Sequence, residues 1–134
     1  MRRLVLVALS ALTLAACTDN TAPSGDFRGT YALRTINGSN LPYTFPGSST
    51  TVQSETMAIN TDGSYTDTIN YSSSTYIERG FYTANNGSIF FTPTPTSQNP
   101  SPTSYQGSVS GSVLTILIPG GNGSTGYSSV YAKN

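Results

Sequence analysis

Four acidic side chains, Glu55, Asp62, Asp67 and Glu78, are the residues of this chain whose type could support acid–base chemistry. Two carboxyl groups can hydrolyse a glycosidic bond when one is protonated and the other is ionised. The chain contains no His, so it lacks the usual general base near neutral pH and cannot form a Ser–His–Asp triad. Because proteins rich in strands carry acidic residues on their wet faces, we predict solvated carboxylates and no catalytic residue.

A metal site is the second chemistry that these residues could support. Asn60, Asp62 and Asp67 supply oxygen ligands of the kind that calcium prefers. Their spacing lacks the alternating acids and the final Glu of an EF-hand loop, and the Asp62-Gly63 pair is typical of a hairpin turn. With no His and with Cys17 as the only Cys, we expect no zinc site. We predict no metal and no cofactor.

Residues 1–16 have the pattern of an export signal. Met1-Arg2-Arg3 gives a basic start, and the run from Leu4 to Leu14 is almost wholly apolar. This run is too short for the roughly 20 residues that a membrane-spanning helix needs. A basic start, a short apolar centre and small residues before a cleavage site are typical of a secretory signal that is later removed.

The end of this signal, Leu14-Ala15-Ala16-Cys17, resembles the lipobox of bacterial lipoproteins. The resemblance implies that the thiol of Cys17 receives a diacylglyceryl group, that the chain is cut after Ala16, and that the new amine is acylated. Residues 1–16 would then be the signal peptide, and 17–25 the lipidated Cys and a flexible tether. Two or more acyl chains hold a protein firmly on a membrane. Thr18, in the place where Asp favours the inner membrane, indicates the outer membrane of a bacterial cell envelope.

The charge of the chain argues against a polyanionic partner. The formal net charge is +0, but Arg2 and Arg3 belong to the signal, so the remainder holds four basic against six acidic side chains, a formal balance of −2. No cluster of Lys and Arg is present to bind nucleic acid or anionic headgroups. Because the only Cys is the lipidation site, no disulfide can form, and the fold must depend on packing and strand pairing.

From Phe27 onward the sequence consists of short strand-like segments separated by turn residues. Asn37-Gly38 is a strong hairpin signal, and the four prolines between Pro93 and Pro102 indicate a loop. Regular short strands with frequent turns predict a sandwich or barrel, and tight hairpins favour an up-and-down order. We predict an all-β domain over 26–134, a small eight-stranded antiparallel up-and-down barrel. The eight expected strands are Gly29–Ile36, Thr51–Asn60, Ser64–Tyr71, Thr75–Thr83, Ser88–Thr92, Tyr105–Ser110, Ser112–Ile118 and Gly126–Ala132.

Several short motifs in this domain resemble lipocalins. Asp26-Phe27-Arg28-Gly29-Thr30-Tyr31 is similar to the opening Gly-x-Trp motif, with Tyr31 in place of Trp. In lipocalins a basic residue after the last strand often covers that Trp, which implies that Lys133 lies over Tyr31. Further similar segments are Ile36-Asn37-Gly38 with Leu41-Pro42, Thr61-Asp62-Gly63-Ser64-Tyr65, Arg79-Gly80-Phe81-Tyr82 and Tyr105-Gln106-Gly107-Ser108-Val109. The resemblance implies a lipocalin-like barrel.

An eight-stranded barrel is either filled by its own side chains or holds one small ligand. The resemblance implies a non-enzymatic protein that binds a small hydrophobic ligand inside the barrel. Strand alternation predicts the interior residues that would contact it: Tyr31, Leu33, Met57, Ile59, Phe91, Leu114 and Ile116.

A fully packed barrel remains open as the alternative, because the compact strands leave little room for a cavity of several hundred Å³. In that case the protein would act as an interaction module. The loops Thr92–Ser104 and Pro119–Tyr127 would then contact another envelope protein or a glycan.

Overall fold

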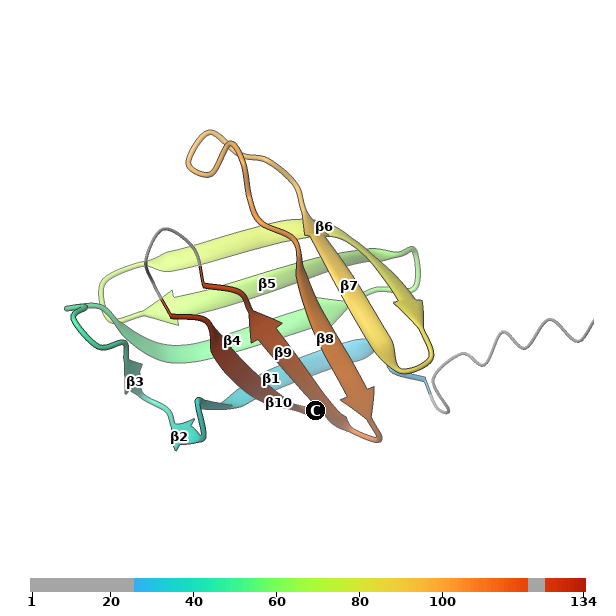
Figure 1. Cartoon of the computed structure of the whole chain (residues 1–134), viewed down its shortest axis with the longest axis horizontal. Helices are drawn as coiled ribbons and strands as arrows, with labels where there is room; N and C mark the ends of the chain where they lie inside the picture. The colour runs from blue at the N-terminus through green and yellow to red at the C-terminus, as the bar shows by residue number, and fades with distance from the viewer. Residues whose placement is uncertain (1–25, 121–124) are drawn as a thin grey trace, which may run out of the picture.

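The structure, a computed structural model, describes residues 26–120 and 125–134. The expected signal peptide, the lipidation site Cys17 and the tether lie outside these residues. Figure 1 shows strands wrapped around a common interior, with no helix in the described part of the chain. The strands are β1 (Gly29–Ile36), β2 (Ser39–Asn40), β3 (Tyr43–Thr44), β4 (Thr51–Ile59), β5 (Ser64–Tyr71), β6 (Thr75–Asn85), β7 (Ser88–Pro93), β8 (Tyr105–Ser110), β9 (Val113–Ile118) and β10 (Tyr127–Lys133).

Eight of these strands form a closed antiparallel barrel. Each strand from β4 to β10 pairs with the next, β10 pairs with β1, and β1 pairs with β4 to close the circle. This arrangement confirms the predicted all-β up-and-down barrel. Of the two short strands, β2 pairs with the last residues of β1 and β3 pairs with the first residues of β4.

The hairpin turns formed where the local sequence predicted them. Asn37 and Gly38 have φ angles of 49° and 79°, and Asn86 and Gly87 have φ angles of 49° and 81°. Type I′ turns need positive φ at both central residues, which Asn tolerates and Gly adopts freely. β6 ends at Asn85, two residues beyond the expected Thr83 and directly before the second of these turns.

The two ends of the barrel differ in the length of their connections. Short turns at 60–63, 86–87 and 111–112 join strands at one end, which we call the closed end. The long segments 37–50, 94–104 and 119–126 and the short bend 72–74 join strands at the other, the open end. β1 begins at the closed end and β10 finishes there, so the described chain starts and stops on the side opposite the long loops (Figure 1).

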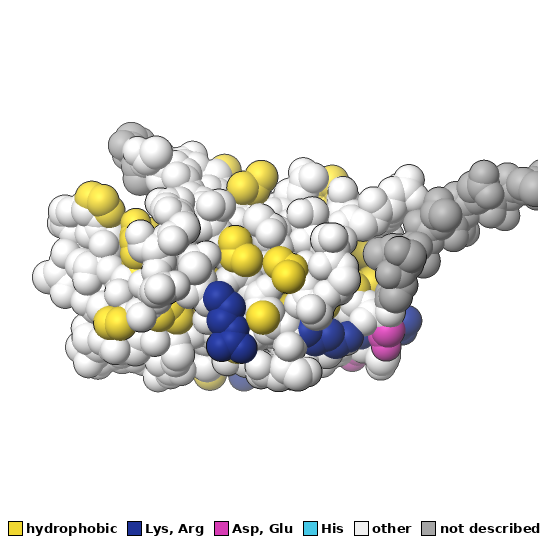
Figure 2. Space-filling view, turned by 90° about the horizontal axis from the view of Figure 1, so that it is seen from below, with side chains coloured by type: hydrophobic (Ala, Val, Ile, Leu, Met, Phe, Trp, Pro, Cys, Tyr) yellow, Lys and Arg dark blue, Asp and Glu magenta, His cyan; other side chains and the backbone are white. Residues whose placement is uncertain are grey.

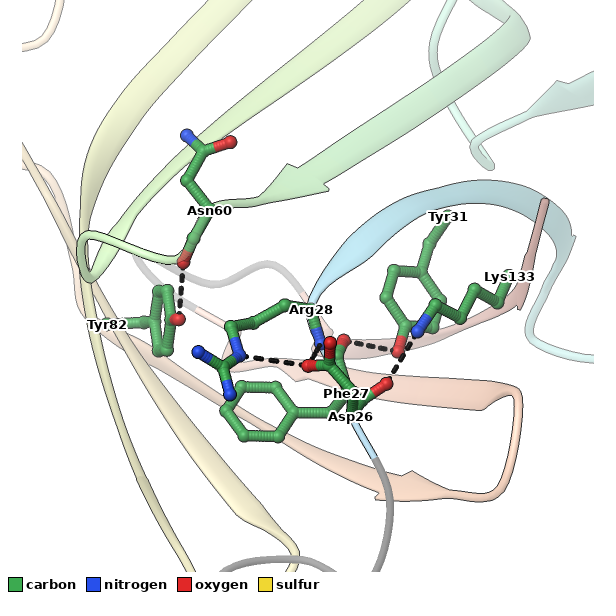
Figure 3. Close-up of polar contacts among 7 residues, drawn as sticks. All are labelled: Asp26, Phe27, Arg28, Tyr31, Asn60, Tyr82 and Lys133. Carbon is green, nitrogen blue, oxygen red and sulfur yellow. Dashed lines mark hydrogen bonds and ion pairs between the residues drawn. The ribbon is translucent and has the colours of Figure 1, made fainter.

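Residues before β1 seal the closed end (Figure 3). The ring of Phe27 packs edge-on against Tyr82, with centroids 5.9 Å apart, and Tyr82 donates to the carbonyl of Asn60 at 2.6 Å. The hydroxyl of Tyr31 donates to the carbonyl of Phe27 at 2.5 Å. The Lys133 ammonium donates to the carbonyl of Asp26, also at 2.5 Å. Tyr31 and Lys133 are partners across β1 and β10, so both ends of the domain are fixed to each other.

Apolar side chains fill the interior at the closed end and continue to Ile36 and Val52 near the open end. Strand alternation points every second residue inward, and these side chains form one buried cluster. All seven residues that we predicted for the interior are buried there, and Tyr31, Phe91 and Leu114 are completely inaccessible to solvent.

The outer surface carries little charge. Figure 2 shows one outer face, on which separate apolar side chains lie among uncharged polar ones and the basic side chains occupy separate places. Phe81, Phe90 and Leu117 are the most exposed large apolar residues, at 64%, 48% and 59%. Within the described residues, no helix has the length and apolar character needed to cross a bilayer.

Candidate functional site

Three acidic residues from neighbouring strands meet inside the open half of the barrel. Asp67 on β5 is directly opposite Glu78 on β6. Glu55 on β4 is opposite Ile69, which puts it diagonal to Asp67 on the same inner face. Glu55 and Asp67 are only 8% and 6% exposed. Our prediction of solvated carboxylates is therefore wrong for these residues, because strand alternation places Glu55 on the same face as Met57 and Ile59.

Asp62, the fourth acid of the predicted set, lies apart from this group. It sits in the turn between β4 and β5, at the closed end, where its carboxylate accepts hydrogen bonds from the backbone N–H and the hydroxyl of Ser64. These two bonds lower the pKa of Asp62. This residue performs the turn-stabilising role that the sequence indicated.

Glu78 is held by two tyrosines. The hydroxyls of Tyr65 and Tyr105 each donate to Oε1 of Glu78 at 2.8 Å. The two rings also flank Phe91, with centroids 5.0 Å and 5.1 Å from it. Burial raises the pKa of both hydroxyls above the usual value, so both remain protonated donors.

The position of Tyr65 depends on Gly80. Tyr65 and Gly80 are partners across β5 and β6, and a Cβ on Gly80 would lie 2.7 Å from Cε1 of the Tyr65 ring. The absence of a side chain lets the ring lie against the strand and reach Glu78, two residues along β6.

Glu55 and Asp67 lie diagonal to each other on the inner face. Glu55 accepts a hydrogen bond from the hydroxyl of Tyr131. Burial, with the charges of Glu55 and Glu78, raises the pKa of Asp67 well above its usual value. Burial also raises the pKa of Glu55, although the hydrogen bond from Tyr131 opposes that effect. Both carboxyl groups therefore keep their protons to a higher pH than exposed Asp and Glu side chains do.

One oxygen of the group has no partner. Oδ1 of Asp67 is buried and makes no hydrogen bond. Buried polar atoms in folded proteins are nearly always paired, because an unpaired one costs about 1–3 kcal/mol. Asp67 lies on the wall of a cavity, from which a partner for this oxygen could come.

The cavity has a volume of about 420 Å³. Its wall contains all three carboxylates; Tyr105 and Tyr131, two of their hydroxyl donors, also line it. Asn99, Pro102 and Thr103 from the loop between β7 and β8 contribute to the same wall. We call this space the carboxylate cavity. Its volume contradicts our expectation that the interior has little room.

The carboxylate cavity and the predicted ligand-contacting residues overlap in part. Met57 and Ile116 line it. Tyr31, Leu33, Ile59, Phe91 and Leu114 do not line it and belong to the packed core. Contact of any of the seven with a ligand stays a prediction. The sequence signal for the missed residues was present, since the predicted inward positions Met57 and Ile59 require Glu55 to point inward as well.

A second hollow of about 630 Å³ lies near the same end of the barrel. It is lined by Asn37, Tyr43, Phe45, Pro46, Thr125, Gly126 and Tyr127. None of these side chains carries a charge, and none of the three carboxylates reaches it. The carboxylate cavity is the better candidate site because it combines space with ionisable groups and an unpaired acceptor. Among the described residues, no group of three acidic, His or Cys side chains is arranged to hold a metal ion.

The raised carboxyl pKa values predict a pH-dependent stability. In the window above the usual values of 3.8 for Asp and 4.5 for Glu, the folded protein binds more protons at Asp67 and Glu55 than the unfolded chain does. The free energy of unfolding therefore falls as the pH rises through that window. We expect thermal denaturation to give a lower Tm at pH 8 than at pH 5, and Asp67→Asn to flatten this dependence.

Asp67→Asn should also raise the free energy of unfolding at pH 8 by about 1–3 kcal/mol, because it removes a poorly paired buried acid. Asp62→Asn is the matched control, since it removes an exposed acid and should leave the difference between pH 5 and pH 8 unchanged. An unchanged pH dependence in Asp67→Asn would contradict the raised pKa of Asp67.

Comparison of the sequence with known proteins does not assign the chain to a family. No family model matches the chain, and no curated protein matches it in sequence.

Proposed function

We propose that this chain is a non-enzymatic, lipid-anchored protein of the bacterial cell envelope whose barrel binds a small molecule. The carboxylate cavity carries the binding part of the proposal. Its volume of about 420 Å³ lies within the range of about 300–1,000 Å³ that is typical of small-molecule sites. The lipobox-like residues Leu14 to Cys17 support the anchor, and Thr18, in the place where Asp favours the inner membrane, supports an outer-membrane location.

The wall of the cavity favours a ligand with both polar and apolar parts over a purely hydrophobic one. Met57, Ile69 and Ile116 supply apolar surface, whereas the carboxylates and tyrosines supply hydrogen-bonding groups. A fatty-acid chain would cover the apolar part and leave the buried acids in contact with hydrocarbon, which is unfavourable.

The place of the anchor suits such a function. The described chain begins beside the closed end, at Asp26. A lipid on Cys17 would therefore be attached on the side opposite the long loops, and the mouth of the cavity would face away from the bilayer. A tether of residues 18–25 would hold the barrel about 15 Å from the membrane surface.

Thermal-shift screening of the full chain, purified from membranes in mild detergent, tests the binding function. We expect at least one compound in a panel of fatty acids, other apolar molecules and small amphipathic molecules to raise the Tm. A ligand at 100 times its Kd stabilises the folded state by about 2.7 kcal/mol. For a domain of this size this corresponds to a shift of several degrees.

Two tryptophan variants of the same loop provide a control. Thr103 is exposed and lines the cavity, whereas Ser101 is exposed and does not. Thr103→Trp should reduce the shift by obstructing the mouth, and Ser101→Trp should leave it unchanged. Equal shifts in both variants would place the ligand elsewhere, and a panel with no stabilising compound would argue against a ligand-binding barrel.

A further inference from the structure

The carboxylate cavity brings acidic groups together without a basic group in its wall. Three of the five acidic residues in the described part of the chain line it. None of the four described basic residues, Arg28, Arg34, Arg79 and Lys133, is part of its wall. Buried charges are normally paired with an opposite charge, so the site as it stands lacks a cation.

The hydroxyl donors around the cavity are already committed. Tyr65 and Tyr105 donate to Glu78, and Tyr131 donates to Glu55. Asp67 is only 6% exposed, and its Oδ1 accepts no hydrogen bond. The atom that would complete the site is therefore a hydrogen-bond donor that enters from the cavity.

An ammonium group meets both requirements. It carries one positive charge and three donors, and charge-assisted hydrogen bonds to carboxylates are about twice as strong as neutral ones. The aromatic rings of Tyr71, Tyr76 and Tyr127 and the aliphatic side chains of Ile69 and Ile118 line the remaining wall. They suit a small apolar or aromatic body attached to the cation.

We infer that the carboxylate cavity binds a small organic ammonium ion, with the cation directed at Asp67 and the neighbouring carboxylates and the organic part against the tyrosine and isoleucine wall. This inference rests on the proposed function, since it names the ligand class of the same cavity. A neutral polyol would satisfy Asp67 but would leave the charge unbalanced, and an anion would add to it.

Three probes that share one aromatic body test the inference. 2-Phenylethylamine is a cation, 2-phenylethanol is its neutral counterpart, and phenylacetate is an anion of similar size. Isothermal titration calorimetry of the full chain in mild detergent, at pH 7.5 and low salt, should give an affinity for the amine at least 10-fold above that for the alcohol. Phenylacetate should show no measurable binding.

Two variants distinguish the contribution of Asp67 to amine binding from that of the overall charge of the protein. Asp67→Asn should reduce the affinity for the amine by about 10-fold or more and leave that for the alcohol nearly unchanged. Asp62→Asn removes the same charge at the closed end and should change neither affinity.

The possible outcomes distinguish the two proposals. Binding of the alcohol or of phenylacetate as tightly as the amine would overturn the ammonium inference while leaving a ligand-binding barrel in place. An equal loss of amine binding in Asp67→Asn and Asp62→Asn would also overturn it. Absence of binding by all three probes, together with no stabilising compound in the thermal-shift panel, would overturn both.

Discussion

Gly80→Ala should destabilise this protein by about 3 kcal/mol or more, at the upper end of what overpacking a core costs. A Cβ at this position would collide with the carbonyl oxygen of Thr92, and it would lie 2.8 Å from Cα of Pro93 and 2.7 Å from the Tyr65 ring. Two of these atoms belong to the backbone of the neighbouring strand and cannot rotate away. The midpoint of urea denaturation, followed by circular dichroism, measures the loss.

The same change should disturb the candidate site. Displacement of the Tyr65 ring would remove one of the two hydroxyls that donate to Glu78. We therefore expect the variant to lose ligand-induced thermal stabilisation in addition to global stability. If it fails to fold, the comparison with Gly107→Ala remains informative.

Gly107→Ala is expected to cost less. A Cβ there would lie 3.0 Å from the carbonyl of Thr115, 3.3 Å from Leu114 and 3.4 Å from Ile116, and small shifts of the two aliphatic side chains relieve part of the crowding. Thr83→Ala, an exposed change on the same strand as Gly80, should leave the midpoint within experimental error. A Gly80→Ala protein as stable as the parent would show that the registers of β5, β6 and β7 are wrong.

Cys17→Ser should move nearly all of the protein from the membrane fraction to the soluble fraction of the cell. The lipobox-like pattern implies acyl chains on the thiol and on the new amine, and each buried methylene contributes about 0.8 kcal/mol to membrane binding. A Ser hydroxyl would not receive the thioether-linked diacylglyceryl group. Cell fractionation followed by immunoblotting measures the distribution.

Thr18→Ser is the matched control, because it changes the adjacent residue and leaves the thiol in place. This variant should remain with the membranes. Mass spectrometry of the membrane-bound parent should find lipid on the peptide that begins at Cys17. Membrane retention of Cys17→Ser equal to that of the parent would refute the anchor and leave the barrel and its cavity unaffected.

The sequence alone was sufficient for the strands, their order and most of the turns. These features follow from short-range rules. Alternating apolar residues define a strand with one buried face, and Asn-Gly pairs at 37–38 and 86–87 adopt the backbone angles of a tight hairpin without help from distant residues. Closure then followed from the number of strands, because an open sheet of this kind would leave unpaired edges.

Strand alternation predicted the apolar residues of the interior. Tyr31, Phe91 and Leu114 are buried as expected because apolar side chains need only an inward direction. The same alternation also directs Glu55 inward, but whether a carboxylate is tolerated there depends on its partners. Its donor, Tyr131, is 76 positions away in the sequence.

Only the tertiary structure decided that three acids from β4, β5 and β6 meet in one cavity. Their meeting depends on the register between strands and on tyrosines contributed by β5, β8 and β10, and the loop between β7 and β8 completes the wall of the cavity. The sequence determined most of the barrel because hairpin turns, and the pairing of the consecutive strands that they join, are governed by neighbouring residues. The site formed through contacts between distant residues, and its unpaired oxygen became evident only when all of those contacts were in place.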